Sequence, residues 1–374
     1  MGQSSPREGL KSVHRVVVKL GSTTVSSPVF SDLMEDLQAC RERGVEVVIV
    51  TSGAVAAGMK VTGAMDRPTV LAEIQALAAV GQAAVMGWYN EAFSRHGVHC
   101  AQLLLTHEGI SHRKHLLNIR RTFDAVLSRG IVPVVNENDT VAVEELRFGD
   151  NDRLASALAS VVEAGAVILL SDIDALYDGD PRQDEGARPI PEVMEIDQQI
   201  RSVAQGQGTD LGTGGMASKV AAAELSMAAG IPLIVASGSE TSVVSRLLSG
   251  EALGTCFNPK GRIVGRRRHW IGFLSKIQGS VTVDPGAVVA LKDRGSSLLS
   301  IGVTGVEGVF DRGDAVAIVG PEGAEVGRGI VGYGSAELDL IAGSASDEAA
   351  RILNVTVGNP VIHRNDLLLT DATD

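Results

Sequence analysis

The chain has 374 residues, with 45 Asp and Glu against 33 Lys and Arg, and a formal net charge of −12. This acidic balance argues against a general nucleic-acid-binding protein, and a hydrophobic fraction of 44% argues against wholesale disorder. Aromatic residues make up only 3%, so the core must be built from Val, Leu, Ile and Ala, which suits a buried parallel sheet covered by helices.

Short apolar segments alternate with helical segments along the first two thirds of the chain. The apolar segments end at glycines or polar turns, which is typical of buried strands, and the alternation predicts βαβ units in an α/β fold with a mostly parallel sheet. In chain order we expect strands at 16–20, 45–50, 98–105, 131–136, 166–170 and 231–236, helices at 30–40, 69–94, 113–129, 151–163 and 215–229, and a strand-like excursion at 141–148.

The pattern changes after Gly254, where a basic, glycine-containing stretch precedes short strand-like pieces separated by glycines. These pieces predict a small β-barrel or sandwich. We expect three parts: a catalytic domain at 1–258, a basic linker at 259–277 and a small β-rich domain at 278–374. The strand-like pieces lie at 280–284, 287–292, 302–310, 315–320 and 325–333.

Lys19 lies inside the first apolar strand, one residue before its end and close to Gly21. A buried charge is costly unless it meets an opposite charge, so Lys19 is a candidate for binding an anion such as a phosphate. The alternative is a lysine that reaches solvent from the edge of the sheet.

Ser52 and Gly53 follow the second strand at the start of a helix, where free backbone N–H groups can bind an anion. The nearby Gly58 and Lys60 nearly form a P-loop, but Met59 separates them and no Ser or Thr follows, so the spacing fails that pattern. A plain turn at Gly53 is the alternative.

Polar side chains crowd the end of the fourth strand and the start of the following helix. Helix capping explains one or two of them, but amides and carboxylates in this number could hold the ammonium of an amino acid, or organise lysines and Mg²⁺. They are Asn136, Glu137, Asn138, Asp139, Asp150, Asn151 and Asp152.

Three glycines, Gly212, Gly214 and Gly215, precede a helix that carries Lys219 about one turn in. Such a glycine loop before a helix N-terminus suits a polyphosphate, with a flexible loop and an exposed lysine as the alternative. Upstream, Ser171 and Asp172 come just after the fifth strand, where Asp172 could reach a nucleotide or its metal.

Two lysines, two glycine loops and the polar cluster together indicate phosphoryl transfer by positioning and charge neutralisation. Other chemistries have weaker support. His112 and His115 would share a helix face but lack the Glu of a zinc protease, and three distant cysteines predict neither a disulfide framework nor a CxxC metal site.

Several segments in this order resemble the glutamate 5-kinases of the amino-acid-kinase family, and the C-terminal part resembles the PUA domain of many bacterial members. The segments are VVVKLGS, VTSGAVAAG, VNENDTVA, FGDNDRLASAL, LLSDIDALYDGDPR and LGTGGMASK. The resemblance implies a three-layer αβα catalytic domain with a largely parallel eight-stranded sheet. It also implies ATP-dependent phosphorylation of the γ-carboxylate of L-glutamate to L-glutamyl 5-phosphate, with Mg²⁺, as the first step of proline biosynthesis.

By the same resemblance, Lys19 and Lys219 neutralise the transferring phosphoryl group and Asp152 orients them as a third catalytic residue. Ser52, Asp139 and Asn151 are expected to bind glutamate. No protein ligand of the metal is assigned. The expected nucleotide-binding residues are Lys19, Ser171, Asp172, Thr213, Gly214, Gly215, Met216, Ala217, Ser218 and Lys219.

The resemblance further implies feedback inhibition by proline and a homo-oligomer, either a dimer or a tetramer. The beginning of the chain has no apolar targeting segment and no apolar run reaches membrane-spanning length, so we expect a cytoplasmic protein that does not enter a membrane.

Two rival functions remain. A kinase acting on N-acetylglutamate or aspartate would share the fold and the lysines. RNA binding would suit a PUA domain, but residues 280–374 hold six Lys and Arg against fourteen Asp and Glu, which opposes a phosphate-binding surface. A basic cluster at Lys260, Arg262, Arg266, Arg267 and Arg268 keeps that alternative open.

Overall fold

The computed structural model describes residues 6–141, 151–206, 215–259, 270–355 and 359–370. The predicted excursion at 141–148 therefore lies almost wholly outside the described residues, as does the basic cluster at 260–268. Contacts divide the chain into two compact units. One unit comprises Met1–His107 and Asn118–Ile263, and the other comprises Glu108–Leu117 and Val264–Asp374.

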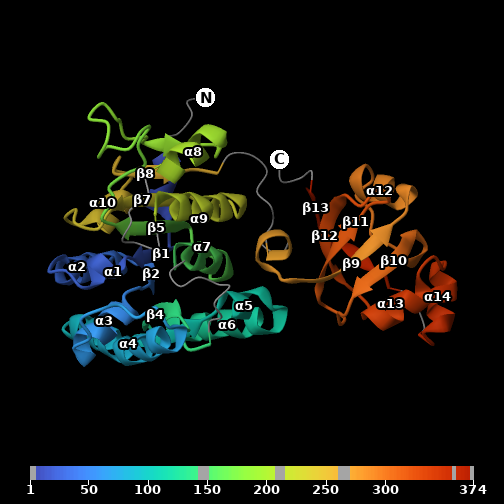
Figure 1. Ribbon diagram of the computed structural model, residues 1–374, viewed down its shortest axis with the longest axis horizontal. Coiled ribbons are helices and arrows are strands. Elements are labelled where there is room, and N and C mark those ends of the chain that lie inside the picture. The colour runs from blue at the N-terminus through green and yellow to red at the C-terminus, as the bar shows by residue number, and fades with distance from the viewer. Residues whose placement is uncertain (1–5, 142–150, 207–214, 260–269, 356–358, 371–374) are drawn as a thin grey trace. The chain divides into compact units, whose positions relative to one another are not determined.

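The first unit is built on an eight-stranded sheet in the order β3-β4-β2-β1-β5-β7-β8-β6 (Figure 1). Every neighbouring pair is parallel except β7 and β8, which confirms the predicted, mostly parallel α/β sheet. The strands are β1 (Arg15–Leu20), β2 (Glu46–Val50), β3 (Cys100–Leu105), β4 (Val132–Glu137), β5 (Ala166–Ser171), β6 (Glu192–Val193), β7 (Leu233–Ser237) and β8 (Thr255–Phe257).

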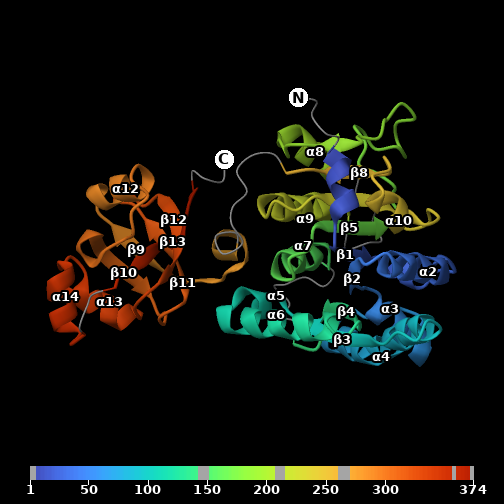
Figure 2. The same cartoon turned by 180° about the vertical axis from the view of Figure 1, so that it is seen from behind.

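Helices cover both faces of this sheet, with α2 and α10 on one side and α7 and α9 on the other (Figures 1 and 2). The five predicted helices are confirmed to within a few residues. None of the helices in the described ranges is both long and apolar enough to cross a membrane. The helices up to residue 248 are η1 (Pro6–Ser12), α1 (Ser22–Val25), α2 (Val29–Glu42), α3 (Ala54–Thr62), α4 (Leu71–Ser94), α5 (His107–Ser111), α6 (Arg113–Leu127), α7 (Asn151–Val161), α8 (Gln198–Gly206), α9 (Met216–Ala228) and α10 (Val243–Leu248).

The alternation of side chains along β1 decides where Lys19 points. Val16, Val18 and Leu20 belong to the same buried cluster as Leu33 of α2, so they face the α2 layer. Because successive side chains of a strand point to opposite faces, Lys19 faces the α7 and α9 layer. The buried ammonium group of Lys19 therefore lies on the side of the sheet that α7 and α9 cover.

The second unit contains a five-stranded sheet in the order β10-β9-β11-β12-β13, which confirms the predicted small β-rich domain. Its strands are β9 (Ile277–Val283), β10 (Val303–Gly308), β11 (Ala315–Val319), β12 (Glu325–Val331) and β13 (Ile362–Leu369). Its helices are η2 (Trp270–Leu274), α12 (Pro285–Lys292), η3 (Ser300–Gly302), α13 (Ser335–Ile341) and α14 (Ser346–Ile352).

One predicted strand of this unit is wrong, because residues 287–292 are helical and belong to α12. The Asp284 side chain accepts a 2.7 Å hydrogen bond from the backbone N–H of Ala287, and Pro285 occupies the first turn. A capping carboxylate followed by proline starts a helix, and this local signal outweighs the strand propensity of the valines that follow.

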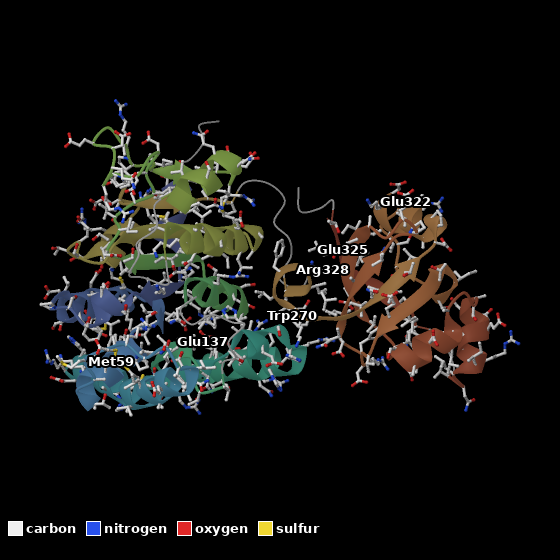
Figure 3. All side chains as sticks on the ribbon, in the orientation of Figure 1. Met59, Glu137, Trp270, Glu322, Glu325 and Arg328 are labelled. Carbon is white, nitrogen blue, oxygen red and sulfur yellow. The ribbon has the colours of Figure 1, made fainter. Side chains whose placement is uncertain are left out.

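The π-helix η2 packs on the sheet of the second unit. Trp270 is buried with Ile330 and Leu368, and Arg328 of β12 donates a 2.8 Å hydrogen bond from Nη1 to the carbonyl of Gly272 (Figure 3). Trp270 is thus a packing residue of this unit.

Candidate functional site

The carboxyl ends of four parallel strands bring the predicted polar segments to one edge of the sheet. In the register of the sheet, Lys19 of β1 lies beside Val50 of β2 and Leu169 of β5. Val50 in turn lies beside Val135 of β4. The residues that follow these positions therefore start from the same edge, which is where ligands bind in open α/β sheets.

A buried carboxylate joins the two predicted catalytic lysines. Asp152, the second residue of α7, is 0% exposed. Its Oδ1 lies 2.6 Å from Nζ of Lys19, and its Oδ2 lies 3.1 Å from Nζ of Lys219. Ser218 adds a 3.1 Å hydrogen bond from its hydroxyl to Oδ2. The structure thus brings together all three residues predicted to be catalytic, from β1, α7 and α9.

The lysines keep this carboxylate ionised although it is buried. Burial by itself raises the pKa of Asp152, but the charges and hydrogen bonds of Lys19 and Lys219 outweigh burial and lower the pKa to about 2. The lysine side chains are also buried. The cluster thus holds two buried ammonium groups close together, a feature suited to receiving an anion.

Asn151 precedes Asp152 and holds a second, neutral network. Its Nδ2 lies 3.0 Å from the carbonyl of Thr51, from Oγ of Ser52 and from Oδ1 of Asn136. The side chain therefore binds residues that follow β2 and a residue of β4, and it does not cap its own helix. The capping interpretation does not hold for this residue. Two predicted glutamate-binding residues, Ser52 and Asn151, are in direct contact.

Helix α4 contributes two residues to this network that the sequence analysis missed. Nδ2 of Asn136 donates a 2.8 Å hydrogen bond to Oε1 of Gln82, and the hydroxyl of Tyr89 donates a 3.0 Å hydrogen bond to Oγ1 of Thr51. Gln82 and Tyr89 are both buried. They lie inside a helix, remote in sequence from the glycine loops, so the loop motifs carry no signal for them.

The close crossing of α3 and α4 explains how Gln82 reaches the site. A Cβ at Gly58 would lie 1.9 Å from the carbonyl oxygen of Leu77, and a Cβ at Gly81 would lie 1.8 Å from that of Ala54. Only glycine allows the two helix backbones to approach so closely. A glycine next to a glutamine within the apolar stretch 76–86 of α4 was the available signal for this crossing.

The same geometry explains the near-P-loop. Gly58 lies inside α3 at the contact with α4, and Lys60 is exposed in the last turn of that helix. Gly53 precedes the helix with φ +92°, a conformation that favours glycine. This segment is therefore a turn followed by a tightly packed helix, as the failed spacing indicated.

Asp139 lies two residues beyond the end of β4 and is half-buried. Burial raises the pKa of its carboxyl to about 6. The strand register places β4 next to β2, and Thr51 and Ser52 directly follow β2. Asp139 thus belongs to the same sheet edge, with a protonation state that changes near neutral pH.

The predicted nucleotide residues begin at the end of β5. Oγ of Ser171 accepts a 3.1 Å hydrogen bond from the backbone N–H of Ile173, and Asp172 is exposed. Thr213 and Gly214 lie outside the described residues. Gly215 precedes α9, Met216 is buried, Ala217 is exposed and half-buried Ser218 contacts Asp152.

The His112 and His115 rings lie 5.6 Å apart between centroids. Among the residues that the structure describes, no group of three or more His, Cys, Asp or Glu side chains could hold a metal ion.

Comparison with known proteins identifies two domains in the chain. Residues 14–237 match the amino acid kinase family, and residues 279–353 match the PUA domain. A protein named glutamate 5-kinase from Geobacter sp. (strain M21) is 45% identical over 97% of this chain and 99% of its own length. Proteins of the same name from Thermus thermophilus and Chromohalobacter salexigens are 44% and 41% identical, each over 98% of this chain and 99% of their own length.

A solved UMP kinase from Bacillus anthracis has a TM-score of 0.46 at 16% identity over 67% of this chain and 97% of its own. The full-length similarity and the two matched domains show the family. The chain belongs to the amino acid kinase family, in its group of glutamate 5-kinases that carry a PUA domain.

Proposed function

We propose that the protein phosphorylates the γ-carboxylate of L-glutamate with ATP to give L-glutamyl 5-phosphate, the first step of proline biosynthesis from glutamate. The observation that carries this proposal is the pairing of Lys19 and Lys219 with Asp152, next to the contact between Asn151 and Ser52. The names of the full-length relatives support the choice of amino acid.

The chemistry suits the lysine cluster. A carboxylate nucleophile is already deprotonated at neutral pH, so the reaction needs no general base. The difficulty is to bring two anions together. In our proposal Lys19 and Lys219 offset negative charge on the transferring phosphoryl oxygens, and Asp152 holds the two ammonium groups in place.

We assign the neutral network and Asp139 to the amino-acid substrate. Ser52, just after β2, and Asn151, at the start of α7, offer uncharged polar groups. Asp139 offers a carboxylate to the substrate ammonium. This division places the anionic and cationic ends of glutamate against groups of suitable polarity.

We assign the nucleotide to the ends of β5 and α9, through Ser171, Asp172 and the segment 213–219. Mg²⁺ would enter with the ATP phosphates, because Mg²⁺ in phosphoryl-transfer sites is held largely by phosphates and water. When bound, the ion would add positive charge to the phosphates. The steps assigned to Lys19, Lys219 and Asp152 do not depend on protein ligands of the ion.

We also propose the finer properties that the family resemblance implies. These are feedback inhibition by proline, a dimeric or tetrameric assembly, a cytoplasmic location, and the division into a catalytic domain at 1–258, a linker at 259–277 and a PUA domain at 278–374.

The test is ADP formation by the purified full chain with L-glutamate, L-aspartate and N-acetyl-L-glutamate, with and without proline. Trapping the product with hydroxylamine distinguishes an acyl phosphate from ATP hydrolysis. We expect hydroxamate only with L-glutamate, and less of it with proline. A strong preference for N-acetylglutamate would overturn the proposed substrate, because acetylation removes the ammonium assigned to Asp139.

A further inference from the structure

We infer that Gln82 of α4 is a positioning residue for the amino-acid substrate and acts through Asn136 on Asn151 and Ser52. The inference rests on the proposed function, which it deepens by adding a specificity-determining side chain from outside the loop motifs. It is carried by a continuous set of hydrogen bonds from Gln82 to Ser52.

The direction of these hydrogen bonds is set by the backbone at both ends. The N–H of Glu137 donates to Oδ1 of Asn136 at 2.9 Å, so this oxygen accepts and Nδ2 of Asn136 must face Gln82. At the other end, the carbonyl of Thr51 accepts from Nδ2 of Asn151. Because backbone groups cannot exchange donor and acceptor roles, neither asparagine amide can turn over without losing a bond.

This fixed direction determines what Ser52 can offer. Oγ of Ser52 lies 3.0 Å from Nδ2 of Asn151, which can only donate, so Ser52 can only accept there; the two hydrogens of this amide are shared among three acceptors. A hydroxyl that accepts through a lone pair keeps its hydrogen for another partner. The network therefore presents the Ser52 hydroxyl as a hydrogen-bond donor, which suits a carboxylate of the substrate.

Gln82 takes part through one atom only. Its Oε1 accepts the hydrogen bond from Asn136, while its Nε2 is buried and has no hydrogen-bond partner within the described ranges. The side chain thus acts as an acceptor that holds Asn136, and the amide nitrogen is dispensable for that role. This asymmetry predicts that the substitution Gln82→Glu preserves the role of the side chain and that Gln82→Met does not.

Asn151 shows that the network is incomplete on the substrate side. Its Nδ2 has acceptors on three sides, but its Oδ1 is buried and has no donor among the residues that the structure describes. A buried acceptor without a donor is costly, and an N–H donor of the amino-acid substrate would satisfy it. Gln82 holds Asn136 in place and Asn136 holds Asn151, so this positioning favours binding of the substrate.

The first test compares three variants of the full chain. Gln82→Met keeps the volume and removes the acceptor, Gln82→Glu keeps the acceptor, and Asn90→Met is a control at an exposed position of α4. For Gln82→Met we expect the KM for glutamate to rise about tenfold, as for a lost buried hydrogen bond, with the KM for ATP unchanged. We expect Gln82→Glu and Asn90→Met to stay within about threefold of the unsubstituted protein in both constants.

A rise in the KM for glutamate without a rise in the KM for ATP distinguishes a positioning role from a merely structural one. A general loss of folding would lower activity without selecting one substrate, so thermal unfolding is measured for each variant. A glutamate KM within about twofold of normal in folded Gln82→Met would overturn the inference, as would an equal rise in the KM for ATP. If Gln82→Met does not fold, Gln82→Asn, which is too short to reach Asn136, is judged by the same criteria.

Failure of the proposed function has a different signature. In that case the unsubstituted protein would form no hydroxamate from glutamate but would accept another amino acid. The same variants are then compared on that amino acid, where a selective rise in its KM still supports the role of Gln82 and an unchanged KM overturns it.

Discussion

Lys19 and Lys219 bind opposite oxygens of the same carboxylate, although they lie near opposite ends of the kinase sequence. Lys19 contacts Oδ1 of Asp152 at 2.6 Å and Lys219 contacts Oδ2 at 3.1 Å. The carboxylate fixes the separation of the two ammonium groups. The arrangement therefore depends on three elements at once, and each partner can be tested separately.

Removal of either lysine should affect turnover more than folding. We expect Lys19→Ala and Lys219→Ala each to lower kcat by about 10²-fold or more, on the scale of lost transition-state electrostatics. The measurement is steady-state ADP formation at saturating substrates. Lys60→Ala, at an exposed position of α3, is the matched control and should keep normal activity. Near-normal turnover in either site variant would contradict the assignment.

The ion pairs of Asp152 should stabilise the fold in a pH-dependent way. Because the pKa of Asp152 is lowered from 3.8 to about 2, its contribution is fully present above pH 3.8 and is lost as the pH falls towards 2. The size is on the order of 2 kcal/mol of unfolding free energy. Urea unfolding at several pH values between 2 and 6 would measure this contribution as a fall in the unfolding free energy at low pH.

Two variants isolate this effect. Asp152→Asn should lose the stabilisation above pH 3.8 and show a flatter pH profile, because it removes the titrating carboxyl. Asp32→Asn, at an exposed position of α2, should leave the profile unchanged. An identical pH profile in Asp152→Asn and the unsubstituted protein would rule out this source of stability.

Asp139 should make glutamate binding sensitive to pH. Its pKa is raised to about 6 by burial, and the proposed role requires the ionised form to face an ammonium. The Kd for glutamate should therefore rise about tenfold between pH 7.5 and pH 5, where about a tenth of the carboxyl is ionised. Calorimetric titration would measure this. In Asp139→Asn, binding should be weak at all these pH values; a persisting pH dependence would assign it to another group.

The glycine crossing of α3 and α4 should be essential to both stability and substrate binding. Gly81→Ala would place a methyl group 1.8 Å from a backbone oxygen, so the helices must separate. We expect a loss of about 1–3 kcal/mol of unfolding free energy and a raised glutamate KM through displaced Gln82. Gly87→Ala, on the same helix with open space around it, should stabilise by about 0.5–1 kcal/mol. Equal effects of the two variants would contradict the packing role.

Sequence periodicity was sufficient for the main architecture. Alternation of apolar strands and helices predicted the parallel sheet, since such segments can be buried only between helical layers. Because the carboxyl ends of parallel strands share one edge of the sheet, the same alternation implies that Lys19 and Ser52 lie at a common edge. Residues 287–292 were misread because apolar β-branched residues suit a strand, whereas a cap at Asp284 begins a helix.

The sequence alone thus determined the fold class, the acidic net charge and the candidate residues of the charged cluster, because these follow from composition, local periodicity and loop motifs. Only the tertiary structure decided that Gln82 and Tyr89 join that site and that Asn151 does not cap its helix. The reason is geometric: Gly58 and Gly81 let two helix backbones touch, and such a contact leaves no periodic signal in either helix. The excess of acidic residues is offset at the site by two buried lysines, whose proximity also depends on the folded chain.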